Sequence, residues 1–379
     1  PTLANGSSTN ANPKINISII ESSLRDIVFT WNGTNYSIYN SSSLTFMMSF
    51  NNLSALGENS THVVDSTGRG QNGTFNGNTF INTSGKLGYG LQFDGNGDYI
   101  SGTNVILPNL TSEFTVSLWA NPQPNSAYGY FMQPHTTGGG GGGLSIYATT
   151  SDNYPVCSMF NESGSTITLQ STSGIQQARW NHIACNLNQT HLSLYLNGVL
   201  NISTPAGKLL THNLAIWQIG LQGNPASSRY FNGTIDEVMI LNKSLSAAEI
   251  QQLYFTTLMK FNTTQWYTYV SQAKNPSSGL DDGTYTYQAY ASDTLGNSIF
   301  TDQRTVSADL TSPSITFESP TPGDGSSQQS GTLTINVSVS DTFSSVDTCI
   351  LEWSGANQTM TKVGSGSSVT CNVTKSSLS

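Results

Sequence analysis

Two adjacent carboxylates, Asp236 and Glu237, are the side chains of this chain whose types and spacing most suggest chemistry. They lie in the stretch YFNGTIDEVMILNKSLSAAEIQQLY, residues 230–254, of a chain in which charged residues make up only 9%. A carboxylate pair can serve as acid and base in glycoside hydrolysis, and a single carboxylate can ligate a hard cation such as Ca²⁺. The elements that carry the pair decide which chemistry is open to it.

The pair falls within a predicted strand, in which neighbouring side chains point to opposite faces. Ile235, Glu237 and Met239 are expected on one face, and Asp236 and Val238 on the other, so we predict that the two carboxylates diverge. A retaining glycosidase needs its two carboxyl groups roughly 5–5.5 Å apart on one face. No glutamate of the chain has an acidic partner at i+2 or i+4, and neither Gly-x-Ser-x-Gly nor His-Glu-x-x-His occurs. We predict no catalytic residues and no enzyme activity.

A short helix is predicted after this strand. Ser246 and Glu249 have the spacing of a capping box, in which each side chain bonds the other residue's backbone amide. Ile250, Leu253 and Tyr254 then fall on one helical face. This helix is expected to pack its apolar face against the strands before it.

The composition limits the class of protein. The chain has 379 residues, an apolar fraction of 36% and a formal net charge of −9. This charge argues against a nucleic-acid partner, which requires a basic face. No run of about 18 apolar residues is present, so no membrane span is predicted. The chain begins at Pro1, and we expect it to be a processed or partial piece of a longer polypeptide.

The chain is rich in Asn-x-Ser/Thr sequons, the acceptor motif for N-glycans. Their number exceeds what the Asn-, Ser- and Thr-rich composition would produce by chance. We therefore expect an exported, N-glycosylated protein located outside the cell, on the cell surface. The candidate glycosylation sites are Asn5, Asn16, Asn32, Asn35, Asn40, Asn52, Asn59, Asn72, Asn82, Asn109, Asn161, Asn188, Asn201, Asn232, Asn242, Asn262, Asn336, Asn357 and Asn372.

The four cysteines support the same compartment. Their spacing favours the disulfides Cys157–Cys185 and Cys349–Cys371 in separate domains, although four cysteines allow three pairings. Four buried thiols remain the alternative. Neither pair has the spacing of a CxxC metal site.

An internal repeat organises the chain. INISIIESSLRDIVFTWNGTNYSIY, residues 15–39, aligns with INVSVSDTFSSVDTCILEWSGANQTM, residues 335–360, and places Trp31 and Trp353 at equivalent positions. The offset between the copies is too large for one small β-domain. A second domain is therefore predicted to be inserted into the first copy.

The end of the first copy is predicted in residues 257–308. DDGTYTYQAYASDTLGN there resembles the penultimate strand of immunoglobulin-like and fibronectin-like sandwiches, which implies that Tyr285 hydrogen-bonds back to the turn before it. Residues 13–44 and 257–308 are thus expected to form one split immunoglobulin-like sandwich. Residues 1–12 are a predicted leader or linker.

Residues 309–379 are predicted to form a second immunoglobulin-like sandwich that is incomplete. The chain ends where the first copy still has its DGTYTYQAYA hairpin to come. Either the polypeptide continues beyond Ser379, or a neighbouring copy of the protein supplies the missing strands by β-augmentation.

The insertion, residues 45–256, resembles laminin G-like domains, the concanavalin A-like jelly roll. The segments that carry the resemblance are LTFMMSFNN, VVDSTGRGQNGT, GLQFDGNGDYIS, FTVSLWANP, ARWNHIACNLNQTHLSLYLNGVL and the stretch 230–254. The resemblance implies an all-β chain: a jelly roll inserted into one immunoglobulin-like sandwich and followed by a second.

The same resemblance implies one structural Ca²⁺ held by Asp65 and Asp236, with backbone carbonyls of residues 66–72 completing the oxygen shell. The alternative is that Asp65 caps a turn through its own backbone. The glycine run at residues 138–143 is expected to be a mobile loop. Tyr128, Tyr130, Trp217 and Tyr230 are expected to be core or rim residues, with sugar stacking as the alternative, so the ligand-binding residues stay unknown.

Such modules resemble those of large archaeal and bacterial surface proteins. The expected role is a non-enzymatic structural unit of a filament, stalk or surface layer that contacts neighbouring copies. The first alternative is an adhesin whose laminin G-like domain binds surface glycans or protein. The second is a carbohydrate-binding appendage of a glycan-degrading enzyme.

Overall fold

The computed structural model describes residues 2, 4–103, 112–124, 129–135, 143–149, 153–209, 216–223, 229–327, 329 and 331–376. The chain divides into two compact units. Unit 1 comprises residues 1–3, 14–278 and 286–304, and unit 2 comprises residues 4–13, 279–285 and 305–379. As predicted, the regular structure of the described residues is almost all β-strand; the helices among these residues are a one-turn 3₁₀ helix, η1 (Ser54–Leu56), and the α-helix α1 (Ala247–Phe255).

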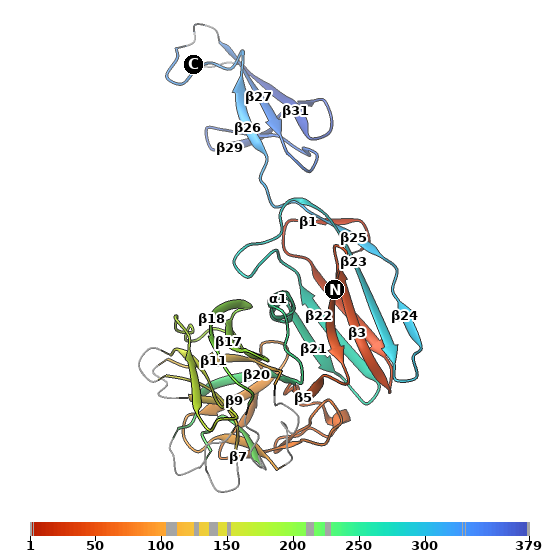
Figure 1. The fold of residues 1–379 in the computed structure, drawn as a ribbon. Helices are drawn as coiled ribbons and strands as arrows, with labels where there is room; N and C mark the ends of the chain where they lie inside the picture. The colour runs from red at the N-terminus through yellow and green to blue at the C-terminus, as the bar shows by residue number, and fades with distance from the viewer. Residues whose placement is uncertain are drawn as a thin grey trace. The chain divides into compact units, whose positions relative to one another are not determined.

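Two large sheets form the jelly roll of unit 1 (Figure 1). The eight strands of the first sheet are, in spatial order, β15 (Thr166–Gln170), β14 (Pro155–Phe160), β13 (Leu144–Ala148), β12 (Gly129–His135), β19 (Ile216–Ile219), β10 (Tyr99–Gly102), β7 (Gly73–Asn76) and β6 (His62–Val63). Those of the second are β18 (Val199–Pro205), β17 (His191–Leu196), β16 (Asn181–Asn188), β11 (Phe114–Pro122), β20 (Asn232–Leu241), β9 (Gly90–Asp94) and β8 (Phe80–Asn82), with β5 (Leu44–Met48) also paired to β20.

The core of the jelly roll follows from the two-residue period of its strands. Val116, Leu118 and Ala120 of β11 point into one cluster with residues of both sheets. The residues between them, Ser117 and Trp119, point to the other face of the second sheet. The Cys157–Cys185 disulfide joins β14 of the first sheet to β16 of the second, inside this core.

The segments on either side of the insertion pair with each other, and we call their assembly the host sandwich. β2 (Lys14–Ile20) pairs with β22 (Gln265–Ser271), which pairs with β21 (Thr256–Lys260). β3 (Leu24–Trp31) pairs with β4 (Thr34–Asn40) and with β23 (Gly283–Asp293), and β23 also pairs with β24 (Ser298–Phe300). Ile27, Leu258 and Trp266 pack between the two groups of strands. The immunoglobulin-like identity of the host sandwich stays a prediction.

Unit 2 contains a four-stranded sheet and a hairpin. The sheet order is β26 (Ser314–Glu318), β27 (Thr332–Ser340), β31 (Ser368–Ser376) and β30 (Thr361–Val363). The hairpin consists of β28 (Ile350–Trp353) and β29 (Ala356–Thr359). β1 (Ser7–Thr9) pairs in parallel with β25 (Arg304–Ala308).

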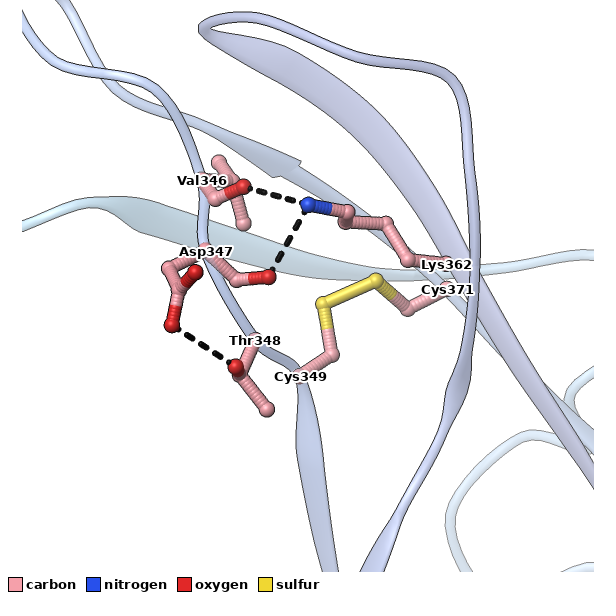
Figure 2. The surroundings of a disulfide bond; sticks show 6 residues. All are labelled: Val346, Asp347, Thr348, Cys349, Lys362 and Cys371. Carbon is pink, nitrogen blue, oxygen red and sulfur yellow. Dashed lines mark hydrogen bonds between the residues drawn. A yellow bond between two sulfur atoms is a disulfide. The ribbon is translucent and has the colours of Figure 1, made fainter.

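A disulfide and a lysine fix the segment that leads into this hairpin. Cys349, just before β28, is joined to Cys371 of β31 (Figure 2). The Lys362 ammonium donates to the backbone carbonyls of Val346 and Asp347, each at 2.9 Å. Both disulfides therefore join the pairs that the spacing favours.

The predicted tyrosine corner is confirmed. The Tyr285 hydroxyl donates to the Asp281 carbonyl at 2.9 Å, four residues back along the chain. This bond ties the start of β23 to the turn that precedes it.

The internal repeat is visible as two matching hairpins. Trp31 and Trp353 each end a strand, and the next two residues, Asn32–Gly33 and Ser354–Gly355, all have positive φ. Such pairs form the type I′ turns that match the twist of a hairpin. The copies differ at one edge: β3 has β23 as a second neighbour, whereas β28 pairs only with β29 within the described residues.

Part of the inner face of the unit 2 sheet is uncovered. Ile315 and Phe317 of β26 lie opposite Val339 and Val337, which belong to the core cluster. Partners directly opposite share a face, yet Ile315 and Phe317 are 64% and 67% exposed. The described strands of this unit therefore leave an apolar strip without cover.

Candidate functional site

The strand β20 contains a β-bulge at the acidic pair, so the predicted alternation is wrong there. Glu237 has φ of +52°, and the register between β20 and β11 shifts at this point. Ile235 and Val238 consequently both face the jelly-roll core, with two residues between them. Met239, predicted on the same face as Ile235, packs in the cluster with the host sandwich. An inserted residue of this kind reverses the faces after it, which a period-two count cannot detect.

Asp236 is fully buried and holds a loop in place. Its Oδ2 accepts hydrogen bonds from the backbone amides of Lys86 at 2.8 Å and Leu87 at 3.3 Å. Its Oδ1 accepts from the amide of Glu237 at 2.8 Å. Burial raises the pKa of this carboxyl, and the three amides oppose that rise because they stabilise the ionised form.

Glu237 is buried without the hydrogen bonds that would offset the cost of burying a carboxylate, as far as the described residues show. Both of its carboxylate oxygens are buried and have no hydrogen-bond partner in the described part of the chain. Burial, and then the charge of Asp236, raises the pKa of Glu237 well above its ordinary value. Of the two neighbours, Glu237 is the one that holds a proton, because Asp236 has the donors that an ionised carboxylate requires.

The substitution Glu237→Gln is expected to stabilise the protein at neutral pH. The unfolded state releases the Glu237 proton near pH 4.5, whereas the folded state retains it to higher pH, so folding stability falls as pH rises from 4.5 through the folded pKa. Glutamine cannot ionise and removes this loss, so the free energy of unfolding at pH 7 should rise. Urea unfolding at pH 7 and pH 4 checks it. A gain equal at both pH values would show that the carboxyl is not the cause.

A polar and aromatic cluster lies on the outer face of the second sheet, around Trp119. The Ser117 hydroxyl is 2.8 Å from His182 Nε2. The Lys86 ammonium lies 3.8 Å from the centre of the Trp119 ring, and Tyr254 of α1 stacks on that ring at 5.3 Å. Burial, followed by the nearby charge of Lys86, lowers the pKa of His182 to about 3, so the imidazole is neutral.

This cluster has the groups of a serine nucleophile and a histidine base, but substrate has no access to it. Ser117 is 2% exposed and His182 is 0% exposed. His182 Nδ1 has no described partner that would orient the ring as the third member of a triad does. Ser117 and His182 were not predicted to meet, because they are 65 residues apart and come together only through the pairing of β11 with β16.

The helix α1 covers the cluster, and its predicted capping box is confirmed. Ser246 Oγ accepts from the Glu249 amide at 3.2 Å, and Glu249 Oε2 accepts from the Ser246 amide at 2.8 Å. The predicted apolar face is also present, because Ile250 is fully buried and Leu253 is packed beside it. Within the stretch 230–254, β20 is thus a strand of the second sheet, and α1 packs over the outer face of that sheet.

Asp65, the other predicted calcium ligand, caps a turn. Its Oδ1 accepts from the amides of Met47 at 3.2 Å and Thr67 at 3.1 Å, and the Thr67 hydroxyl lies within 2.8 Å of both carboxylate oxygens. No hydrogen bond or shared partner links Asp65 to Asp236, and no group of three or more His, Cys, Asp or Glu able to hold a metal occurs within the described ranges. Both carboxylates thus already accept hydrogen bonds from the protein, and the calcium ion stays a prediction.

Calcium titration tests whether Asp65 and Asp236 hold a calcium ion. If Asp65 only caps its turn, as the alternative holds, 1 mM EDTA or Ca²⁺ should leave the Tm of the jelly roll unchanged. A specific ion at 100 times its Kd would add about 2.7 kcal/mol and raise the Tm by several degrees. A rise of that size in calcium, lost in Asp236→Asn, would support the predicted ion instead.

The other residues singled out from the sequence are distributed as follows. Trp217 is fully buried in the core, edge-on to Phe46, and Tyr130 is buried on the first sheet. Tyr230 is half-buried. Tyr128, Asn109 and residues 138–142 of the glycine run lie outside the described residues. None of the sequon asparagines in the described ranges is buried.

A polar groove of about 460 Å³ lies in unit 1, where β4 leads into β5 and β20 leads into α1. Ser37, Asn40 and Ser42 line one side, and Asn242 and Lys243 the other. Leu44, Leu241 and Leu245 contribute apolar surface. Hydroxyl and amide groups over an aliphatic floor suit a small polar ligand such as a sugar.

These features define a class: a two-sheet β-sandwich of the jelly-roll type, with the Asp236–Glu237 pair buried and a helix packed over the outer face of one sheet. Residues 94–251 match the family model described as the concanavalin A-like lectin/glucanases superfamily. The inserted domain is therefore a concanavalin A-like jelly roll, as the resemblance implied. No curated protein matches the chain. No helix within the described residues is long and apolar enough to cross a membrane.

Several solved structures are similar to parts of the chain. The binding domain of Paraclostridial mosquitocidal protein 1 is 19% identical over 57% of this chain, with a TM-score of 0.46, and the match spans about half, 52%, of that protein. Domain 4 of AbnA, an extracellular arabinanase from Geobacillus stearothermophilus, in complex with arabinotriose, is 21% identical over 56% of this chain and 98% of its own, with a TM-score of 0.44. The botulinum neurotoxin DC binding domain, in complex with rat synaptotagmin II, is 13% identical over 86% and 75%, with a TM-score of 0.44.

Proposed function

We propose that this chain is part of a non-enzymatic, extracellular cell-surface glycoprotein in which β-sandwich modules carry the jelly roll. The observation that carries this proposal is the state of the acidic pair. Asp236 is engaged by three amides and Glu237 is closed off from solvent, so neither can reach a glycosidic bond. Two disulfides support an oxidising compartment.

The chemistry of this proposal is tested by hydrolysis assays. We expect the protein to release no reducing sugar from β-glucans or arabinans, and Glu237→Gln to change nothing. Turnover that Glu237→Gln abolishes would overturn the non-enzymatic part. The structural role is tested by mass measurement and negative-stain imaging of native material. A regular filament, stalk or layer supports it, and isolated soluble monomers contradict it.

The second candidate is an adhesin, and the groove between Asn40 and Lys243 is the specific observation that favours it. Binding of monosaccharides or short oligosaccharides can be measured by NMR or calorimetry. An adhesin of this kind would lose binding in Ser42→Trp, which fills the groove, and keep it in Ser326→Trp, an exposed position of unit 2. If the protein binds none of a broad panel of glycans, the adhesin role is contradicted and the structural role remains.

The uncovered strip of unit 2 supports a role for strand complementation between neighbouring copies. Ile315 and Phe317 are exposed on the inner face, and β28 has no second neighbour among the described strands, whereas β3 has β23. A strand added beside β28 would pair its free backbone groups and extend the cover over that face. We expect Phe317→Asp to reduce self-association in sedimentation experiments, whereas an unchanged sedimentation profile would count against complementation.

A further inference from the structure

The sequon asparagines differ in what their side chains do in the folded chain. N-glycan transfer forms a bond from Asn Nδ2 to C1 of a sugar and breaks the C1–O bond of a glycosyl phosphate donor. The phosphate leaves with the bonding electron pair, and one amide proton is lost. Transfer to the folded protein therefore requires an Nδ2 that is accessible and is not donating to the fold.

Three sequons meet this requirement and are also held in a fixed geometry. In each, Oδ1 accepts a hydrogen bond from the hydroxyl of the sequon's own third residue, while Nδ2 donates to no group among the residues that the structure describes. The distances are 2.8 Å for Thr61 to Asn59, 2.7 Å for Ser163 to Asn161 and 3.1 Å for Thr190 to Asn188. Asn59 and Asn188 are exposed and Asn161 is half-buried. We call these three the open sequons.

Other sequons use Nδ2 to hold the fold together. Asn40 Nδ2 donates to Asp26 Oδ1 at 2.6 Å, and Asn82 Nδ2 donates to Gln92 Oε1 at 3.0 Å. Asn336 Nδ2 donates to the Ser319 carbonyl at 3.0 Å. All three asparagines are half-buried. We call Asn40, Asn82 and Asn336 the closed sequons.

The amide orientation in two closed sequons is fixed by the backbone. Asn40 Oδ1 accepts from the amides of Ser42 and Ser43, at 3.1 and 3.0 Å, and Asn82 Oδ1 accepts from the amide of Ser84 at 2.9 Å. An amide rotated by 180° would face these N–H donors with its own N–H₂. The Nδ2 group of each of these two asparagines therefore donates to the protein, and a glycan can be attached only after that hydrogen bond and the local packing are broken.

We propose that the fold sorts the sequons: Asn59, Asn161 and Asn188 carry glycans, and Asn40, Asn82 and Asn336 do not. The proposal rests on the proposed function, because only an exported protein meets a glycosyl donor. It adds the sites of modification and their cause, which is the hydrogen-bonding state of Nδ2. The open sequons need no rearrangement to react, whereas each closed sequon must first break a contact of the folded state.

Glycopeptide mass spectrometry of native protein, with occupancy measured at each sequon, is the first test. We expect high occupancy at the open sequons and at least tenfold less at the closed ones. Equal occupancy of both groups would overturn the sorting while leaving the glycoprotein proposal intact. Absence of glycan from every sequon would overturn the proposed function itself.

A pair of variants tests the cause. Asp26→Ala removes the acceptor of Asn40 Nδ2, and we expect occupancy at Asn40 to rise several-fold with no change at Asn59. Arg25→Ala is the matched control: it removes the 2.7 Å ion pair of Asp26 but leaves the bond to Asn40. A rise at Asn40 in both variants would point to general loosening of the strands and would contradict the stated cause. If Asp26→Ala does not fold, the occupancies of the unaltered protein still decide the sorting.

Discussion

Asp236→Ala is expected to lower the free energy of unfolding by about 3 kcal/mol or more. The substitution removes a fully buried acceptor and leaves the buried amide of Glu237 and the part-buried amides of Lys86 and Leu87 without it. A buried donor without a partner costs about 1–3 kcal/mol, and bonds to a carboxylate are at the strong end of the range. Denaturant unfolding of the jelly roll, followed by tryptophan fluorescence, measures the loss.

Two further variants make this result specific. Asp236→Asn keeps one acceptor oxygen and should lose less than Asp236→Ala. Asp302→Ala, at an exposed aspartate, should change stability by less than about 0.5 kcal/mol. If Asp236→Ala unfolds at the same denaturant concentration as the unaltered protein, the amides find other partners, and Asp236 is not what holds the 86–87 loop.

Removing the Cys157–Cys185 disulfide is expected to have the second large effect. This bond ties β14 of one sheet to β16 of the other, with a sequence separation of 28 residues. A cross-link of that length restricts the unfolded chain and is worth about 3–4 kcal/mol. We expect the double variant Cys157→Ala/Cys185→Ala to lower the Tm of the jelly roll by several degrees in differential scanning calorimetry.

The second disulfide supplies a control within the same chain. Cys349–Cys371 belongs to unit 2, so Cys349→Ala/Cys371→Ala should leave the jelly-roll transition where it is. An equal shift of that transition in both double variants would mean that the two units unfold together and that the bonds do not act separately.

Local signals in the sequence predicted much of this structure. Ser246 and Glu249 form the helix cap, Tyr285 bonds back to Asp281, and the cysteines pair by proximity along the chain. The helix cap and the tyrosine corner each depend on residues three or four positions apart, whose geometry is nearly independent of the rest of the fold, whereas the disulfides were predicted from the separation of the cysteines along the chain.

Features that depend on distant strands could not be predicted. The bulge at Glu237 arises where β20 meets β11, and nothing in the run Ile235–Leu241 marks the extra residue. The bond between Ser117 and His182 likewise requires the register of two strands. The acceptors that close Asn40 and Asn82, Asp26 and Gln92, lie 14 and 10 residues away on paired strands, which the sequon motif does not record.

The pairing of β2 with β22 also sets the order in which the chain can fold. Ile15 lies opposite Val270, so about 250 residues of chain separate the two partners. Closing a flexible loop costs entropy that grows with its length. The folded jelly roll removes most of that cost, because β5 and β20 are already paired and bring the two ends of the inserted segment together. We therefore expect the jelly roll to fold before the host sandwich closes, so a destabilising change within residues 45–256 should also delay the pairing of β2 with β22.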